Sequence, residues 1–148
     1  MGTKRVGWAR IRSLINENQN DLRRRNRQVV TISEDTTLTA EDSGKLIMCN
    51  GASATEVTLP RATDAGLNFR FVLSDNTAHF DILQGDVDDE LVGSIVAITA
   101  KDTGSGSDTK IRFVASTALA GDWVEVYCDG ADWIVCGQTA VNTGIIFA

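Results

Sequence analysis

The sequence has few of the residues on which most enzymes depend. Its 148 residues include one histidine, one tyrosine and one proline. The single histidine, His79, leaves few arrangements for acid–base or nucleophilic catalysis, and no serine lies in a nucleophile-elbow motif. We therefore expect a protein that is not an enzyme, and we assign it no catalytic residue, no metal ligand and no cofactor.

Long hydrophobic runs are also missing. No stretch approaches the roughly 18 apolar residues that a membrane span requires, and no apolar segment near the start indicates a cleaved secretory signal.

The three cysteines, Cys49, Cys128 and Cys136, lack metal-ligand spacing, and their odd number indicates reduced thiols in a protein made in a cytosol. The turn expected at 129–132 does not bring Cys128 opposite Cys136, so we expect no disulfide between them.

Acidic residues are scarce in one part of the chain only. The net charge is −6, but residues 1–30 carry eight basic and two acidic residues, whereas the remaining 118 carry six basic and eighteen acidic ones. A basic arm on an acidic body indicates that the two parts meet different surroundings. We therefore divide the chain into a helical basic arm, residues 1–27, and a β domain, residues 28–148.

The pattern over residues 4–22 predicts a helix with one narrow apolar stripe. The stripe consists of Trp8, Ile11, Ile15, Asn18 and Leu22, which follow each other at alternating spacings of three and four residues. Two interpretations stay open: the stripe docks on an apolar protein surface, or copies of the helix associate with one another and Asn18 sets their register. The segment is short for an autonomous coiled coil, which favours docking.

A run of basic residues follows this helix. It consists of Arg23, Arg24, Arg25 and Arg27. Such a run can be solvated, contact an acidic protein surface or contact nucleic acid. Because no aromatic side chains are interleaved as base-stacking platforms, we do not expect a nucleic-acid partner.

From residue 28 onwards, short β runs alternate with turn residues. The expected strands are Gln28–Ile32, Lys45–Asn50, Glu56–Leu59, Asn68–Ser74, His79–Leu83, Leu91–Thr99, Lys110–Ala115, Asp122–Cys128, Trp133–Gly137 and Gly144–Phe147. No long helical pattern follows the arm. The sequence therefore predicts an all-β fold, with an antiparallel β-sandwich or jelly-roll-like body as the main expectation and a small barrel as the alternative.

Several of these strands have a clear apolar face. The pairs that share a face are Val57 with Leu59, Phe69 with Phe71, Phe80 with Ile82, and Ile111 with Phe113. Asp129–Gly130 predicts the turn of a C-terminal hairpin. Trp123 and Trp133 lie on its two arms, and we expect them to be near cross-strand neighbours in the core; a sugar-binding platform is the alternative.

Two further clusters have ordinary interpretations. The acidic cluster contains Asp86, Asp88, Asp89 and Glu90, with Asp81 nearby. It lacks the spacing of a calcium-binding loop, so we interpret it as a solvated acidic loop, with a cation site as the alternative. The glycine-rich segment 104–107 lacks the lysine and helix of a phosphate-binding loop, and we interpret it as a flexible hairpin loop.

Six segments form an ordered set along nearly the whole chain. They are Gly2–Gly7, Leu38–Lys45, Val57–Pro60, Gly66–Phe71, Gly121–Glu125 and Asp129–Val135. Each alone is only a short local pattern, but their order and spacing resemble those of small capsid decoration (cement) proteins of tailed phages. The resemblance implies a β-sandwich or jelly-roll-like body, usually a trimer, that has no catalytic residues and sits on the outer capsid at local three-fold positions.

The resemblance also implies a partner and a location. The partner would be the major capsid protein, and the chain would be part of the virion, on the outer capsid surface, after synthesis in the bacterial cytoplasm. Similar β modules occur in tail fibres, so a host-attachment module that binds a receptor or glycan is the alternative. The residues expected to contact the capsid are Lys4, Arg5, Trp8, Arg10, Ile11, Arg12, Ile15, Leu22, Arg23, Arg24, Arg25 and Arg27.

Overall fold

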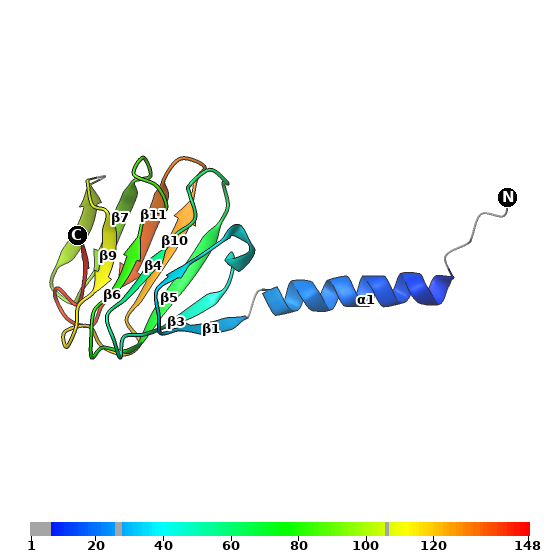
Figure 1. Cartoon of the computed structure of the whole chain (residues 1–148), viewed down its shortest axis with the longest axis horizontal. Coiled ribbons are helices and arrows are strands. Elements are labelled where there is room, and N and C mark those ends of the chain that lie inside the picture. The colour runs from blue at the N-terminus through cyan, green and yellow to red at the C-terminus, as the bar shows by residue number, and fades with distance from the viewer. Residues whose placement is uncertain (1–6, 26–27, 106) are drawn as a thin grey trace.

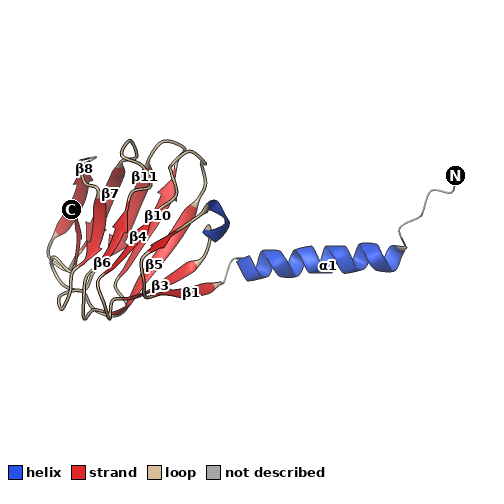
Figure 2. Ribbon diagram, viewed as in Figure 1, coloured by secondary structure: helices blue, strands red, loops and turns tan. Residues whose placement is uncertain are grey.

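The computed structural model describes residues 7–25, 28–105 and 107–148, with the backbone alone for residues 19–25 and 105. One long helix, α1 (Trp8–Arg25), precedes twelve strands and a short 3-10 helix, η1 (Ala40–Asp42). The strands are β1 (Val29–Ile32), β2 (Thr36–Thr37), β3 (Leu46–Asn50), β4 (Thr55–Thr58), β5 (Asn68–Asp75), β6 (Phe80–Leu83), β7 (Leu91–Val96), β8 (Lys101–Ser105), β9 (Lys110–Phe113), β10 (Trp123–Cys128), β11 (Trp133–Gln138) and β12 (Ile145–Phe147). The body is therefore built from strands, as expected, and α1 lies beside it (Figure 2).

The strands form two sheets that lie face to face. The larger sheet has seven strands in the order β1-β3-β5-β10-β11-β7-β8, and the smaller sheet has five in the order β12-β9-β6-β4-β2. Figure 1 shows the two layers, with α1 projecting away from the end of the body where β1 begins. The prediction of a mostly β body with one helix before it is confirmed.

The first six strands alternate between the two sheets. β1, β3 and β5 are parallel neighbours in the larger sheet, and β2, β4 and β6 are parallel neighbours in the smaller one. The chain thus crosses to the other sheet after each strand and winds as a flattened coil. Parallel strands usually need a helical crossover, which the sequence lacks, but here a strand of the opposite sheet serves as the crossover.

The expectation of a purely antiparallel body is therefore wrong. Of the ten strand pairings in the described part of the chain, five are parallel. Four of these belong to the coil of the first six strands, and the fifth joins β11 to β7. The sequence pattern shows which residues alternate along a strand, but it does not show in which direction the neighbouring strand runs.

The last six strands complete both layers. β7 and β8 form an antiparallel hairpin, and the β10–β11 hairpin fits between β5 and β7. β9 and β12 extend the smaller sheet in antiparallel pairs. The sequence pattern predicts neither β2, which has two residues, nor β8, a polar strand at a sheet edge. The interpretation of the segment 104–107 as a loop is wrong for Gly104 and Ser105, which belong to β8, and Gly106 lies outside the described residues.

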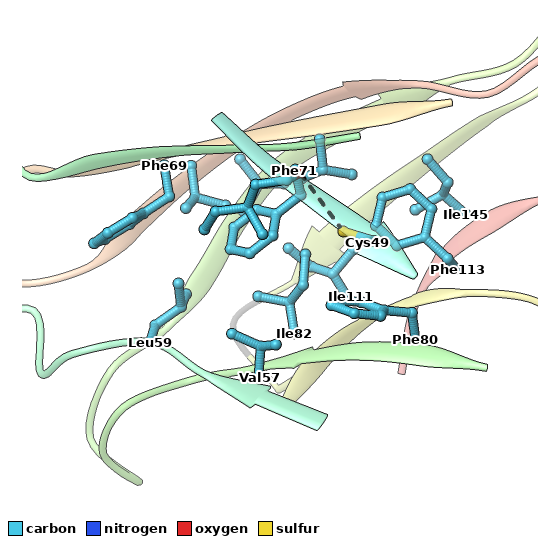
Figure 3. Close-up of a cluster of buried hydrophobic side chains, with 14 of the residues drawn as sticks. Cys49, Val57, Leu59, Phe69, Phe71, Phe80, Ile82, Ile111, Phe113 and Ile145 are labelled. Carbon is cyan, nitrogen blue, oxygen red and sulfur yellow. Dashed lines mark hydrogen bonds between the residues drawn. The ribbon is translucent and has the colours of Figure 1, made fainter. Parts of the chain in front are cut away.

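The core lies between the two layers and comes from alternate positions on the strands. All four predicted same-face pairs are confirmed, because each of their eight side chains is at most 1% exposed. In Figure 3, Val57 and Ile82 of the smaller sheet lie opposite Phe71 of the larger one. The rings of Phe80 and Phe113, on neighbouring strands, meet edge to face with 6.3 Å between their centroids.

The two tryptophans of the C-terminal hairpin lie on opposite faces of the larger sheet. Trp133 is fully buried, 5.8 Å from the ring of Phe69, whereas Trp123 is half-buried on the outer face. The pairing register also places them at opposite ends of the hairpin. The prediction that they are cross-strand neighbours is therefore wrong, and packing in the core is confirmed for Trp133 but not for Trp123. Val124 occupies the inward position on β10, so the alternation of the strand turns Trp123 outward.

Candidate functional site

The helix α1 carries apolar side chains that no described residue of the β body covers. Trp8, Leu14 and Ile15 are 65%, 54% and 49% exposed. Within the described residues, the buried core contains no residue of α1, and Figure 1 shows the helix standing away from both sheets. Among the described residues, the stripe therefore does not dock on the body of its own chain.

The helix begins and ends later than predicted. The carbonyl oxygen of Gly7 accepts hydrogen bonds from the backbone amides of Arg10 and Ile11, at 2.9 and 3.2 Å, and the helix continues to Arg25 rather than ending at residue 22. Residues 4–6, the first part of the predicted helix, lie outside the described residues. The helix therefore includes most of the basic run.

The candidate capsid-binding residues fall into three groups. The side chains are described for Trp8, Arg10, Ile11, Arg12 and Ile15; only the helical backbone is described for Leu22, Arg23, Arg24 and Arg25; Lys4, Arg5 and Arg27 lie outside the described residues. Arg10 and Arg12 are exposed, and the guanidinium of Arg12 lies 5.5 Å from the centre of the Trp8 ring. The structure thus places the described candidates on one projecting element, with two arginines available to an acidic surface.

The outer face of the larger sheet carries an aromatic patch that the sequence analysis did not identify. Arg70 of β5 lies over the ring of Trp123, with its guanidinium 4.5 Å from the ring centre. Glu125 lies opposite Arg70 in the strand register, and Tyr127, on the same face of β10, is 42% exposed. In β10, two buried valines alternate with Trp123, Glu125 and Tyr127. This alternation could have predicted from the sequence that these three side chains point outward.

A shallow hollow opens beside this aromatic patch. It is lined by Gly44, Lys45, Leu46, Asn68, Arg70, Val72 and Glu125. Lys45 is held by an ion pair with Asp42 at the end of η1, so Arg70 and Glu125 are the principal charged groups within reach. An exposed ring beside hydrogen-bonding groups suits a polar ligand with an apolar face, such as a sugar.

Two titratable groups on this outer face are held in their protonated forms. Burial and the neighbouring carboxylate of Glu125 raise the pKa of Tyr127. Burial and Glu125 also raise the pKa of the Cys136 thiol, and the opposing effect of Arg70 is smaller. All three cysteines are free; Cys128 points into the core while Cys136 points outward, so strand alternation separates them.

The outer face of the smaller sheet contains a paired ionic cluster. Arg112 of β9 makes a two-point contact with Asp81 of β6, and the ammonium of Lys110 lies 3.1 Å from the same carboxylate. Burial opposes ionisation of Asp81, but the hydrogen bonds from Arg112 and Lys110 outweigh it and lower the pKa of that carboxyl. The two cations compensate the negative charge of Asp81, so this buried carboxylate is not left unpaired.

His79 is engaged in a structural hydrogen bond. It lies immediately before β6, and its Nδ1 accepts a hydrogen bond from the backbone amide of Ala115 at 3.0 Å. The bond joins the start of β6 to the chain that follows β9. His79 therefore helps to fix the end of the smaller sheet.

The acidic residues 86–90 point in different directions. Asp89 is buried and accepts a hydrogen bond from the backbone amide of Ala62 at 3.1 Å, whereas Asp86 and Asp88 face Arg61 at 3.5 and 3.9 Å. Over residues 7–25, 28–105 and 107–148, no group of three or more histidine, cysteine, aspartate or glutamate side chains could hold a metal ion. Asp89 thus makes a buried hydrogen bond that supports the fold, whereas Asp86 and Asp88 face the guanidinium of Arg61.

No protein-family model matches the sequence, and a search of the curated proteins finds no match. In the part of the chain that the structure describes, no helix is both long and apolar enough to cross a membrane. Two exposed features are the candidate functional sites: the projecting helix α1 and the outer face of the larger sheet.

Proposed function

We propose that the chain is a structural virion protein of the decoration (cement) class. In this role it binds the outer capsid surface and stabilises contacts between subunits of the major capsid protein. The observation that carries the proposal is the division of the chain into two parts. A compact two-sheet body follows a projecting helix with exposed apolar and basic side chains. Such a molecule can attach through the arm while its body stays outside the shell.

Within this proposal the two parts have separate tasks. Residues 1–27 are the basic arm, and the two facing sheets support a jelly-roll-like head, although half of its pairings are parallel. Arg10 and Arg12 are exposed and can pair with carboxylates on the capsid surface. A specific joint of this kind buries on the order of 1,000 Å² or more, and the many copies on a closed shell add avidity.

The first experiment counts copies of the chain in purified virions by mass spectrometry. Decoration of the whole shell predicts a copy number comparable to that of the major capsid protein, and imaging of the particle should show the body outside the shell. If purified virions contain none of the chain, the proposal is wrong.

The second experiment tests the arm. The buried core begins at Ile32, so residues 28–148 should fold without the arm and unfold with the same cooperativity as the full chain. This truncated protein should bind capsids weakly and lose the salt-sensitive part of the binding. In the full-length chain, the double variant Arg10→Glu, Arg12→Glu should weaken binding, whereas the neutral control Asn16→Gln should not. Capsid binding that is unchanged by both the deletion and the charge reversal would show that the arm makes no contact.

A host-attachment module is the second candidate, and the aromatic patch favours it. The Trp123 ring, stacked under Arg70, and the exposed Tyr127 lie beside a polar hollow, which is an arrangement able to stack on a sugar ring. This alternative predicts few copies per virion and binding on a glycan array that Trp123→Ala abolishes. Many copies together with no glycan binding would exclude it.

A further inference from the structure

We infer that the α1 helices of several copies of this chain associate with one another, parallel and in register, through the apolar stripe. The inference deepens the proposed function and rests on it for its biological role. It assigns the apolar stripe to contacts between copies of the chain and leaves the basic residues to contact the capsid surface. The stripe consists of Trp8, Ile11, Ile15, Asn18 and Leu22. These residues form the contact surface, and the same helix of a second copy of the chain packs against it.

A helix of this kind needs a partner in order to persist in water. An isolated helix of about 15 residues is marginally stable, and most helices in proteins are stabilised by packing of their apolar face. α1 has 18 residues, and Trp8 and Ile15 of its stripe are 65% and 49% exposed. The body does not cover them, because the helix stands away from both sheets (Figure 1).

The width of the stripe indicates that the partner is another helix. The alternating spacings of three and four residues place Trp8 and Ile15 at the a positions of a heptad repeat and Ile11 at a d position. Helices that dock on a globular core usually use three of seven positions, whereas a seam of only a and d positions is typical of a coiled coil. Leu14 is the one large apolar side chain beside the seam among the described residues. The described positions on the opposite side, Arg10 among them, are exposed and, apart from Ala9, polar.

Asn18 indicates that the partner helix is identical and parallel. An asparagine in an apolar seam needs a hydrogen-bonding partner, and it finds one when the same asparagine lies at the same level on a parallel copy. In an antiparallel pair in which Ile15 packs against Ile11, Asn18 would lie level with Trp8 and its amide would face no asparagine. The polar residue thus selects one orientation and one register.

The seam also indicates how many copies associate. Isoleucine occurs at a d position, Ile11, and at an a position, Ile15, and β-branched residues at both kinds of position favour three or four strands over two. Three copies is the smallest assembly that fits. Because all the bodies follow the same end of the helix, a parallel bundle about 27 Å long would carry three heads at that end.

Charge gives this association a distinctive salt dependence. A parallel, in-register bundle places residues 23–25 of every copy, all arginines, at the same level. Salt screens the repulsion between them, so self-association should strengthen as salt is raised. A contact between the basic arm and an acidic surface should weaken instead. The sign of the salt effect therefore separates the two uses of the arm.

The first test is sedimentation of the full-length chain over a range of protein and salt concentrations. The expected species has about three times the 15.9 kDa mass of one chain, and its share should grow with salt. The double variant Ile11→Asp, Ile15→Asp should be monomeric, while its body unfolds as in the parent. Asn16→Asp, which adds one negative charge outside the seam, should leave the assembly intact. A monomeric parent chain at every soluble concentration would overturn the inference, as would an assembly that survives both seam substitutions.

The second test addresses orientation. In a Cys136→Ser background, which removes the exposed thiol, Asn18→Cys should form disulfide-linked chains under mild oxidation, because parallel copies bring position 18 together. The matched variant Asn16→Cys should not cross-link efficiently. Equal cross-linking at the two positions would overturn the parallel register. If the chain assembles in solution but is absent from virions, only the proposed function is contradicted. If the chain binds capsids as a monomer, only this inference is contradicted.

Discussion

The guanidinium of Arg112 donates to both carboxylate oxygens of Asp81, from Nε at 2.7 Å and from Nη2 at 2.6 Å. The two residues lie directly opposite each other on antiparallel strands of the smaller sheet. The Asp81 side chain is 5% exposed, whereas those of Arg112 and Lys110 are 29% and 27% exposed. The charge of the buried carboxylate is therefore compensated by two cations that remain partly in contact with solvent. This geometry makes Asp81 an acidic group whose charge contributes to the stability of the fold.

Asp81→Asn should destabilise the fold by about 1–3 kcal/mol, because it removes the charge that two partly buried cations share. The measurement is the free energy of unfolding from urea denaturation. Removing both partners with Asp81→Asn, Arg112→Met should cost less than the sum of the two single changes. Strictly additive effects would show that the two-point contact contributes nothing.

The contribution of Asp81 should also depend on pH. Its folded-state pKa is lowered from the ordinary value of 3.8, so the ion pair stabilises the fold fully above that value and the stabilisation is lost as the pH falls through the lower folded-state pKa. The difference in unfolding free energy between the parent chain and Asp81→Asn should therefore be constant near neutral pH and shrink in acid. A difference that grows as the pH falls would contradict this account.

Gly93→Ala should destabilise the larger sheet strongly. Gly93 on β7 has φ +154°, and a Cβ atom there would clash with the carbonyl oxygen of Val135 on the parallel neighbour β11. Because that obstacle is backbone, the two strands must separate, and we expect a loss of about 2–4 kcal/mol or failure to fold. Thermal unfolding is the measurement. The neighbouring change Ser94→Ala, on the same strand, should stay within about 0.5 kcal/mol of the parent.

Asp122→Ala should cost more than Asp129→Ala, although both aspartates accept backbone hydrogen bonds in turns. The buried carboxylate of Asp122 accepts from the amides of Leu119 and Ala140, at 2.9 and 2.8 Å, and from the hydroxyl of Thr139 at 2.8 Å. Its loss leaves three donors without this acceptor, and we expect a destabilisation of about 2–3 kcal/mol. Asp129 lies in the exposed turn between β10 and β11, where water can replace it as an acceptor, so its removal should cost clearly less. Equal costs in urea denaturation would contradict the central role of Asp122.

One thiol should react in the native protein. Cys136 is exposed, whereas Cys49 and Cys128 are buried, so a chromogenic disulfide reagent should titrate one cysteine before unfolding and three after it. Because the pKa of Cys136 is raised, its reaction should be slower near pH 8 than that of a free peptide thiol. Glu125→Gln removes the neighbouring charge and should accelerate the reaction. An unchanged rate in that variant would show that the carboxylate does not control the thiol.

The local patterns in the sequence predict the parts of the fold that depend on neighbours in sequence. The alternation at Phe69 and Phe71, and at Ile111 and Phe113, predicts burial correctly, because successive side chains of a strand must point to opposite faces. The same rule, applied to β10, would have placed Trp123 outside. The large apolar side chain of tryptophan suggested burial in the core instead, but the position of Trp123 within β10 turns it to the outer face.

The sequence alone determined that a helix precedes a strand-built body, the spacing of the stripe on that helix, the hairpin turn at Asp129 and most of the buried positions, because each of these follows from spacing along the chain. The tertiary structure alone decided the direction and order of the strands: β11 lies parallel to β7, and β3 lies parallel to both β1 and β5. It also brought Arg70 over Trp123 from strands far apart in sequence. Pairing between distant strands depends on how two layers close over a shared core, and that is a property of the whole chain rather than of any one segment.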